Sequence, residues 1–417
     1  MSAAARRLRV LHASNATARG GAEEHMLGLL RGLDRQSFEP HLACPPGLLR
    51  ELPDLPADVR VHPGAPMTPW DAGAGWPLAR YLRRHRVDIV HVHLSCASRA
   101  IAPWARLARV PTVIETPHVS ERWRQGWKRG YWLDRVADRW LTGYVAVSHA
   151  NADYLRNEKR LAPAKVWTIP NGIDLERFAR ATRAADDPRP ACGIAAQERL
   201  LLCAARLEPQ KGHAVLLNAL AQLDCHAAPP IRLVCLGDGR LAAELRRQAE
   251  ALGLRERVLF LGFCSQVEAW LAVADLCVLP SLYEGMPLVA MEAAAAGCPM
   301  VATAVDGTPE VVVPEATGVL VPPNDAAALA AALRRLLADP ALRRRMAEQA
   351  RAVAAQHFPL QRQVAATAAL YCALGFAPRH GRASRAPLPS LPKEASPASA
   401  SRPAWPRPIR SLRGRHG

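Results

Sequence analysis

The sequence predicts an α/β protein with two doubly wound, Rossmann-like parallel-sheet domains that face one central cleft. Three observations support this. The chain has 417 residues, which is enough for two domains of ordinary size and some additional chain. Short apolar, β-branched runs alternate with longer stretches of helical period, as in a parallel sheet wrapped by helices. The runs fall into two sets, and each set is large enough to form a sheet.

A turn signal separates the two sets of expected strands. Asn171-Gly172 favours a turn, and the charged segment 181–189 after it has no helix or strand pattern. We therefore predict an N-terminal domain over 1–171, a linker over 172–195 and a C-terminal domain over 196–360. The expected strands are 8–11, 41–43, 59–61, 89–92, 112–114, 144–147 and 166–169 in the first domain, and 200–204, 233–236, 258–261, 276–279, 300–303 and 319–321 in the second.

The last part of the chain is expected to contain helices and then a tail. Residues 325–337 and 340–358 have helical period, and Pro359 marks a break before a third helix, which we assign to 361–376. Residues 377–417 are rich in Pro, Arg and Ser. Such a segment cannot bury enough apolar surface to offset its ordering entropy, so we predict a disordered tail.

The chain carries a net charge of +17. Residues 379–417 hold nine basic residues and one acidic residue, so nearly half of this charge lies in the tail. Only five of the 54 basic residues are lysine, an imbalance typical of GC-rich coding. A nucleic-acid-binding surface should be a clustered patch or stripe. Nucleic-acid binding is therefore the less favoured interpretation of the charge.

Cysteine usage and the absence of long apolar runs predict the compartment. The ten cysteines are scattered and form no Cys-x-x-Cys pair, which favours a reduced, cytosolic environment. The N-terminus has no apolar stretch long enough for a signal peptide. No run approaches the ~18–20 apolar residues of a membrane span. We expect a cytoplasmic protein.

One aromatic segment suggests contact with the inner face of the cytoplasmic membrane. Trp123, Trp127 and Tyr131 recur every four residues with basic residues between them. Such a stretch can lie on an anionic membrane or contact a lipid acceptor. Core packing is the competing interpretation, and we favour it for the residues that follow, Trp132, Val136 and Trp140.

The segment 281–292 carries the most informative motif. A helix is expected to begin near Pro287, which is tolerated in a first turn, and to end at Gly297. Its N-terminus would point into the cleft as an anion site. Glu284 in the preceding loop and Glu292 in the helix would then accept hydrogen bonds from sugar or ribose hydroxyls. A solvated helix residue is the competing interpretation of Glu292.

A second motif lies between Arg206 and His213. A helix is expected from about residue 209, which places Lys211 in its first turn. The helix dipole disfavours a cation there by some tenths of a kcal/mol. A bound phosphate between the ammonium and the helix end explains Lys211 better than a solvated charge does. Arg206 offers a planar fork to the same diphosphate.

Two glycine-rich turns also follow expected strands. Glycine permits close approach of a phosphate to the backbone, although each turn could simply be tight. The glycines concerned are Gly20, Gly21, Gly237 and Gly239.

His118 follows the strand 112–114 and is the remaining cleft candidate. A histidine at a strand's carboxyl end can hydrogen-bond a hydroxyl near neutral pH. A structural role for this histidine is equally compatible with the pattern. His91 and His93 are treated as sheet-edge residues of unknown role.

Taken in order, these motifs resemble the retaining nucleotide-sugar glycosyltransferases of family four, which have the GT-B fold. The resemblance covers about residues 8–375 and implies that the helix 361–376 crosses back onto the first domain. The residues that carry it are Gly20-Gly21, His118, Arg206 with Lys211, Gly237-Asp-Gly239, Glu284-x7-Glu292 and Gly307-Thr-Pro-Glu310.

The resemblance implies a role for each matching residue. Arg206 and Lys211 would bind the donor diphosphate, and Glu292 the ribose hydroxyls. Glu284 would bind the donor sugar, and His118 would contact that sugar near its anomeric carbon. The donor would also contact Gly285, Met286, Pro287 and Leu288. Many members have glycine where this chain has Met286-Pro287, and proline removes one N–H donor.

Such enzymes typically need no divalent metal, and the sequence shows no His/Asp cluster of metal-ligand spacing. No cofactor is expected, because the nucleoside-diphosphate sugar is the donor substrate. We expect hexosyl transfer to a saccharide or lipid-linked acceptor in polysaccharide, lipopolysaccharide or glycolipid synthesis. The alternatives are another GT-B enzyme acting on nucleotide sugars, an epimerase or hydrolase, or less favoured, a basic nucleic-acid-binding protein.

Overall fold

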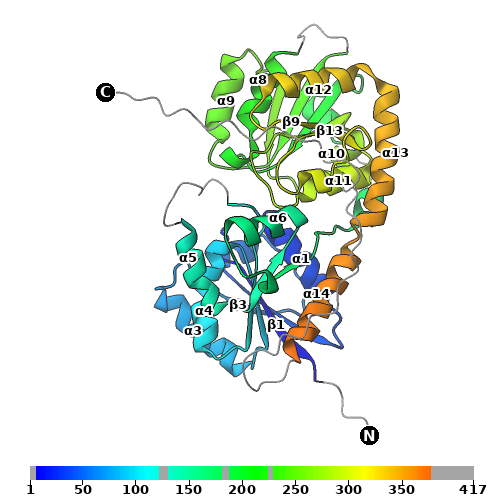
Figure 1. Cartoon of the computed structure of the whole chain (residues 1–417). Helices are drawn as coiled ribbons and strands as arrows, with labels where there is room; N and C mark the ends of the chain where they lie inside the picture. The colour runs from blue at the N-terminus through cyan, green and yellow to red at the C-terminus, as the bar shows by residue number, and fades with distance from the viewer. Residues whose placement is uncertain (1–5, 122–129, 181–186, 224–228, 377–417) are drawn as a thin grey trace.

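Two parallel sheets, one above the other, form the frame of the protein (Figure 1). The structure is a computed structural model and describes residues 6–121, 130–180, 187–223 and 229–376. The first sheet has seven strands in the order β3-β2-β1-β4-β5-β6-β7, and the second has six in the order β10-β9-β8-β11-β12-β13. The predicted fold of two doubly wound domains is confirmed.

Every expected strand is present. The strands of the first sheet are β1 (Leu8–Ala13), β2 (Phe38–Cys44), β3 (Arg60–Pro63), β4 (Ile89–His93), β5 (Thr112–Thr116), β6 (Gly143–Ala146) and β7 (Val166–Thr168). Those of the second are β8 (Arg199–Ala204), β9 (Ile231–Leu236), β10 (Val258–Gly262), β11 (Leu276–Leu279), β12 (Met300–Thr303) and β13 (Gly318–Val321).

Helices cover both faces of each sheet (Figure 1). Those of the first half are α1 (Gly21–Gly32), α2 (Pro46–Arg50), α3 (Ala72–Arg84), α4 (Ser95–Leu107), α5 (Gly130–Ala137), α6 (His149–Asp153) and α7 (Leu175–Arg180). Those of the second half are α8 (His213–Ala221), α9 (Ala242–Ala251), α10 (Val267–Val273), α11 (Leu288–Ala296), α12 (Ala326–Ala338), α13 (Pro340–His357) and α14 (Leu360–Gly375).

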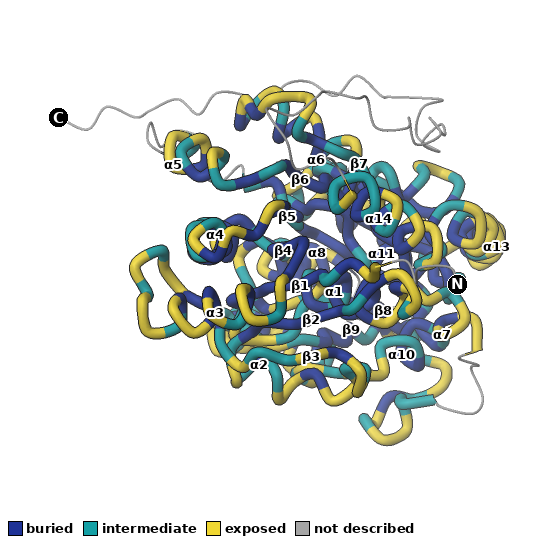
Figure 2. Tube along the Cα trace, turned by 90° about the horizontal axis from the view of Figure 1, so that it is seen from below, coloured by how far each residue is buried: buried dark blue, intermediate teal, exposed yellow. Residues whose placement is uncertain are grey.

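The two-sided cover explains why the central strands read as continuous apolar runs. In β8, Leu200, Leu201, Leu202 and Cys203 are all fully buried, although alternate residues face opposite sides of the sheet. Figure 2 shows buried segments along the sheets and exposed segments on the outer helices and loops.

The segment predicted as a linker contributes to the second domain's core. It contains α7, and the buried side chains of Ile173, Phe178 and Ile194 join the core cluster that includes Leu200 and Met291. The two described parts of the predicted linker, 172–180 and 187–195, therefore both pack into the second domain.

The last helix, α14, lies against the first domain beside α1 and β1 (Figure 1). Leu370 and Tyr371 of α14 belong to one buried cluster with Leu8 and Val10 of β1. A Cβ on Gly32 would lie 2.6 Å from Val364 Cγ2, so this close approach requires glycine.

Among the described helices, none combines the length and hydrophobicity that a membrane crossing demands. The predicted tail, 377–417, lies outside the described residues.

Candidate active site

Loops from the carboxyl ends of the two sheets meet between the domains, where ligands bind in doubly wound folds. The first loop of the N-terminal domain faces the second domain: a Cβ on Gly20 would lie 3.9 Å from the Arg206 side chain. A Cβ on Gly21 would lie 3.9 Å from Leu288 Cδ1. Segments that sequence analysis singled out separately are therefore neighbours in space.

The loop before α11 is hydrogen-bonded to the first domain through three of its carbonyl groups. The bonds run from Ser120 N–H to the Glu284 carbonyl (3.3 Å), from Ser148 Oγ to the Gly285 carbonyl (3.0 Å) and from Asn171 Nδ2 to the Met286 carbonyl (2.9 Å). The loop is thus held at the interface by both domains.

Glycine is required at the closest point of this contact. A Cβ on Gly285 would lie 2.0 Å from the His118 carbonyl oxygen, far inside van der Waals distance. A Cβ on Gly307 would in turn lie 2.1 Å from the Gly285 carbonyl oxygen. His118 and the loop before α11 are therefore packed backbone to backbone.

Lys211 and Glu284 form an ion pair at this interface. Lys211 Nζ lies 2.6 Å from Glu284 Oε1, and Ser281 Oγ donates to the same oxygen over 2.7 Å. The Glu284 side chain is 5% exposed and that of Lys211 is 17% exposed. The Glu284 N–H donates to Asp306 Oδ2 (2.7 Å), which fixes the backbone of the loop.

The predicted place of Lys211 in a helix is wrong. Residues Pro209–Lys211 form a 3₁₀ turn, and α8 begins only at His213. Gly212 between them adopts a left-handed conformation, with φ of +66°, and a Cβ there would lie 2.0 Å from the Pro280 carbonyl oxygen. The turn interrupts the helix, so the dipole argument does not apply to Lys211.

Arg206 projects from the loop after β8 and is exposed. In the part of the chain that the structure describes, its guanidinium makes no hydrogen bond or ion pair. The loop itself is tightly supported, since Cβ atoms on Gly237 and Gly239 would lie 2.2 Å from the Ala205 carbonyl oxygen and 2.5 Å from that of Leu207. These glycines thus support the loop that presents Arg206.

Helix α11 has the predicted boundaries. It begins after Pro287 and ends at Gly297, whose φ is +70°. No side chain caps its N-terminus, so its first amide groups are open to an anion.

Glu292 is a half-buried carboxylate on α11. Within the described ranges it accepts no hydrogen bond. Burial raises its pKa to about 7, the charges of Glu24 and Glu268 add to the rise, and Arg177 opposes it. A desolvated acceptor of this kind suits a ligand hydroxyl.

Sequence analysis missed a group of buried histidines around His118. His91 and His93 are not at a sheet edge, because β4 lies between β1 and β5. Two sets of three, His12/His91/His93 and His25/His93/His118, place one ring nitrogen of each within 4.8 Å of the others. The sequence shows no His/Asp cluster of metal-ligand spacing; the fold brings these histidines together from β1, α1, β4 and the loop after β5. His12 is in register with His91 on the adjacent strand, a pairing that only the fold reveals.

The aromatic segment is only partly within the described residues. Trp123 and Trp127 lie outside them. Tyr131 is half-buried and packs against the first domain's core, with its ring 6.3 Å from that of Tyr154, which favours core packing for this residue. Trp132, predicted in the core, is 57% exposed.

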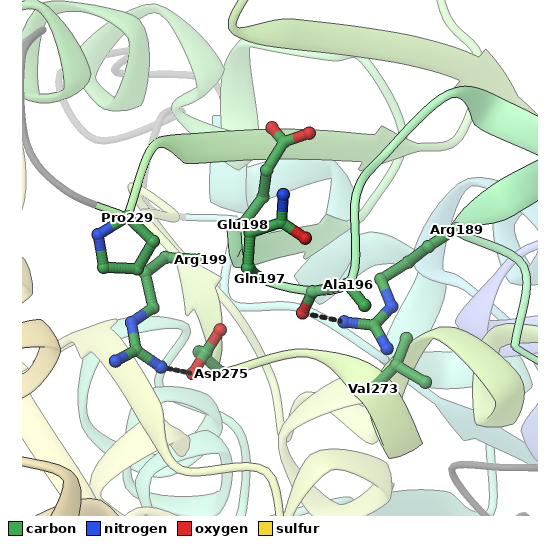
Figure 3. A pocket seen from close by; sticks show the side chains of 8 residues that line it. All are labelled: Arg189, Ala196, Gln197, Glu198, Arg199, Pro229, Val273 and Asp275. Carbon is green, nitrogen blue, oxygen red and sulfur yellow. Dashed lines mark hydrogen bonds and ion pairs between the residues drawn. The ribbon is translucent and has the colours of Figure 1, made fainter.

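A surface pocket lies at the opposite end of the second sheet (Figure 3). It is lined by Arg189, Ala196, Gln197, Glu198, Arg199, Pro229, Val273 and Asp275. Arg199 begins β8 and Asp275 precedes β11, and the two are ion-paired at 3.2 Å. The pocket is therefore far along the strands from the loops at the domain interface.

The fold and the candidate site between the two domains define a GT-B glycosyltransferase. Residues 19–177 match the model of Glycosyltransferase Family 4, and residues 186–353 match that of Glycosyl transferases group 1. The chain belongs to glycosyltransferase family 4 and is an enzyme that transfers hexosyl groups from nucleotide sugars.

Two relatives illustrate the membership. A putative glycosyltransferase EpsF of Bacillus subtilis is 32% identical over 70% of this chain and 78% of its own length. UDP-Gal:alpha-D-GlcNAc-diphosphoundecaprenol alpha-1,3-galactosyltransferase of Escherichia coli is 31% identical over 64% of this chain and 70% of its own length.

Solved structures share the fold. Anabaena Alr3699/HepE in complex with UDP superposes with a TM-score of 0.73 at 23% identity, covering 88% of this chain and all of that one. WaaG, a glycosyltransferase involved in lipopolysaccharide biosynthesis, superposes with a TM-score of 0.71 at 20% identity, covering 87% of this chain and 99% of that one.

Proposed function

We propose that this enzyme transfers a hexosyl group from a uridine diphosphate sugar to a hydroxyl of a lipid-linked saccharide, with retention at the anomeric carbon. The observation that carries the proposal is the pairing of Lys211 with Glu284 next to the open N-terminus of α11. A cation, a carboxylate and free amides side by side suit a ligand that joins a diphosphate to a polyhydroxyl ring.

The diphosphate would be held by Lys211, Arg206 and the first amides of α11. Negative charge develops on this group as the bond to the sugar breaks, and preorganised positive groups stabilise such charge most in a site that excludes water. The exposed guanidinium of Arg206, opposite Gly20, would close over the phosphates from the other side.

The two carboxylates would take the hydroxyl groups. Glu284 is oriented by Ser281 and by the ion pair, so it can accept from the sugar while Lys211 contacts the phosphate. Glu292, which has no hydrogen-bond partner in the described structure, would accept from the ribose. Both assignments agree with the roles that the family resemblance implies.

The donor nucleotide is inferred from other proteins. The E. coli relative is named for UDP-galactose and a diphosphoundecaprenol-linked acceptor, and HepE was solved with UDP. Another relative, from Mycolicibacterium smegmatis, is named for GDP-mannose and is 30% identical over 72% of this chain. A thermal-shift panel of UDP and GDP sugars would therefore distinguish them, since a ligand that binds only the folded state raises its apparent stability.

Product analysis tests the reaction. The enzyme is incubated with the stabilising nucleotide sugar and a polyprenyl-diphosphate saccharide, and the product is analysed by mass spectrometry and by NMR of the new anomeric centre. A new glycosidic bond with the donor's configuration supports the proposal. Free sugar would indicate a hydrolase, an epimerised nucleotide sugar an epimerase, and inverted configuration would refute retention.

We also propose peripheral binding to an anionic membrane, on the sequence of the segment that contains Trp123 and Trp127. The variant with both tryptophans changed to alanine should co-sediment less with anionic vesicles. Equal co-sedimentation of the variant and the parent would rule out this role.

Titration with DNA and RNA at several salt concentrations, with and without residues 377–417, tests the nucleic-acid alternative, since such binding falls steeply with salt.

A further inference from the structure

A continuous chain of buried hydrogen bonds leads from the last helix to His118. Its members other than His118 are fully buried. The contacts, in order, are Thr116 Oγ1 to His91 Nε2 (2.6 Å), His91 Nδ1 to Tyr371 Oη (2.5 Å), Tyr371 Oη to His12 Nε2 (3.5 Å), His12 Nδ1 to His93 Nε2 (3.1 Å) and His93 Nδ1 to His118 Nε2 (3.1 Å).

His91, His12 and His93 each form hydrogen bonds through both ring nitrogens, and His118 is the last member of this hydrogen-bonded series. Burial lowers the pKa of His12 to about 3 and those of His91, His93 and His118 well below the usual range, so the rings are neutral. A neutral imidazole has one N–H donor and one bare acceptor nitrogen. A ring that accepts at one nitrogen must therefore donate from the other, and the direction of the first bond sets every bond after it.

Thr116 sets that direction. Its hydroxyl is fully buried, and His91 Nε2 is the one side-chain partner it has among the residues described. If His91 donated, the threonine proton would be left buried without an acceptor, which costs free energy. The hydroxyl therefore donates to His91 Nε2, and His91 Nδ1–H donates to the Tyr371 oxygen.

The remaining bonds follow in turn. Tyr371 donates its own proton to His12 Nε2, His12 Nδ1–H donates to His93 Nε2, and His93 Nδ1–H donates to His118 Nε2. His118 then carries its proton on Nδ1, which has no hydrogen-bond partner in the described structure. His118 is half-buried, and its backbone packs against Gly285 of the loop before α11.

We propose that this chain fixes His118 as the Nδ1–H tautomer, so that it donates a hydrogen bond to an oxygen of the transferred sugar, and that Tyr371, His12 and His93 are positioning residues. The proposal rests on the proposed function for the identity of the sugar. It also gives α14 a role in the reaction: the helix that continues from the second domain supplies the Tyr371 hydroxyl, which passes the direction set at Thr116 from His91 to His12.

Tyr371→Phe tests the proposal because it removes one hydroxyl and keeps the ring packed against Phe38. Without that donor, the His12–His93–His118 section is free to run in either direction. We expect kcat to fall about tenfold, with the KM for the nucleotide sugar changed less than about twofold. Tyr144→Phe is the matched control, because Tyr144 is also buried but its hydroxyl donates to Asp138, outside this set of hydrogen bonds.

The tautomers can be read directly. Long-range ¹H–¹⁵N correlation spectra of the full chain labelled with ¹⁵N-histidine distinguish Nδ1–H from Nε2–H, and His118→Gln assigns the His118 signal. We expect Nδ1–H in the parent and in Tyr144→Phe, and a mixture or Nε2–H in Tyr371→Phe. If Tyr371→Phe does not fold, Thr116→Val, which removes the hydroxyl at the other end of the chain, takes its place.

Either of two results overturns the proposal: Nε2–H at His118 in the parent, or an unchanged tautomer in the folded variant. Because this readout needs no substrate, it stands even if the enzyme makes a product other than the proposed glycoside. Failure to form the glycoside with the expected tautomers would refute the proposed function alone.

Discussion

The two faces of the domain interface use different chemistry. The second-domain face presents charge: Arg206 is exposed, Lys211 is paired with Glu284, and Glu292 is a carboxylate without a hydrogen-bond partner in the described structure. The first-domain face presents neutral imidazoles in a buried hydrogen-bonded chain. Charged groups suit a diphosphate leaving group. A neutral imidazole that donates a hydrogen bond can orient the sugar without competing with Lys211 for the negative charge of the diphosphate.

The largest effect should come from removing charge on the second-domain face. Lys211→Ala should lower kcat by about 10²- to 10³-fold, because it removes a positive group from the departing diphosphate. Steady-state kinetics with a saturating nucleotide sugar measures this. Lys165→Ala is the control, since Lys165 is ion-paired with Asp138 at 2.9 Å away from the interface.

Lys211→Ala also leaves Glu284 without its cation in a nearly buried position. Circular dichroism and thermal unfolding must therefore show a native fold before its kinetics are interpreted. A folded variant with undiminished turnover would show that the charge contrast between the faces is not catalytic.

The next effect should come from separating the faces without changing any charge. Gly285→Ala places a Cβ 2.0 Å from the His118 carbonyl oxygen, and neither atom belongs to a flexible side chain. The backbones must move apart, and displacement of about 1 Å can cost roughly 10²-fold in kcat. Gly73→Ala is the control, because the nearest atom to a Cβ at this position would be Asp71 Oδ1, at the ordinary contact distance of 3.7 Å.

If Gly285→Ala remained fully active, close contact between the two faces would not be needed. A loss of stability without loss of kcat at a lower assay temperature would likewise limit Gly285 to a packing role. Comparing the two readouts in one variant separates these cases.

The difference between the faces also explains what sequence could predict. Strands, the limits of α11 and the Glu284-x7-Glu292 motif are local patterns, and all lie where expected. Lys211 lies outside a helix because the left-handed Gly212 interrupts it, and the close approach of Pro280, at the end of another strand, leaves no room for a side chain at residue 212. Only the tertiary structure reveals that contact.

The histidine chain was unpredictable for the same reason. Its members come from β1, β4, β5 with its following loop, and α14. Two of them lie 280 residues apart, the pair formed by His91 and Tyr371. Periodicity shows that such residues are buried but not which ones meet, so individual polar residues in apolar strands gave no clear functional signal.

A smaller effect should follow from Glu292 on the second-domain face. Glu292→Ala should raise the KM for the nucleotide sugar about tenfold, since a hydrogen bond to a charged group contributes about 1.5 kcal/mol or more. A matching loss of affinity for free UDP, measured by calorimetry, would place the contact on the nucleotide. Unchanged affinity would remove Glu292 from the nucleotide site.

Glu292 also predicts a pH dependence of stability. Its pKa is raised from 4.5 to about 7 in the folded protein, so the folded state keeps a proton that the unfolded state loses. The stabilisation from this group is fully present below about pH 4.5 and is lost as pH rises through about 7. Glu292→Gln should therefore raise Tm at pH 8 by roughly 2–4 °C and leave it nearly unchanged at pH 4.5. An equal shift at both values would contradict this assignment.

The smallest effect should come from a charge that joins the faces without taking part in either chemistry. Glu310 accepts hydrogen bonds from the N–H groups of His149 (2.9 Å) and Ala150 (2.7 Å), at the start of α6 in the other domain. Glu310→Gln keeps one acceptor oxygen and loses the charge, so it should cost about 0.5–1 kcal/mol. Chemical denaturation measures this, with Glu315→Gln, whose partner is Arg335 in the same domain, as control. The carbonyl groups of the loop before α11 still hold the interface in this variant, so kcat should change less than about twofold. A larger fall in kcat would mean that the contact between Glu310 and α6, and not only the packing at Gly285, aligns the charged face with the neutral one.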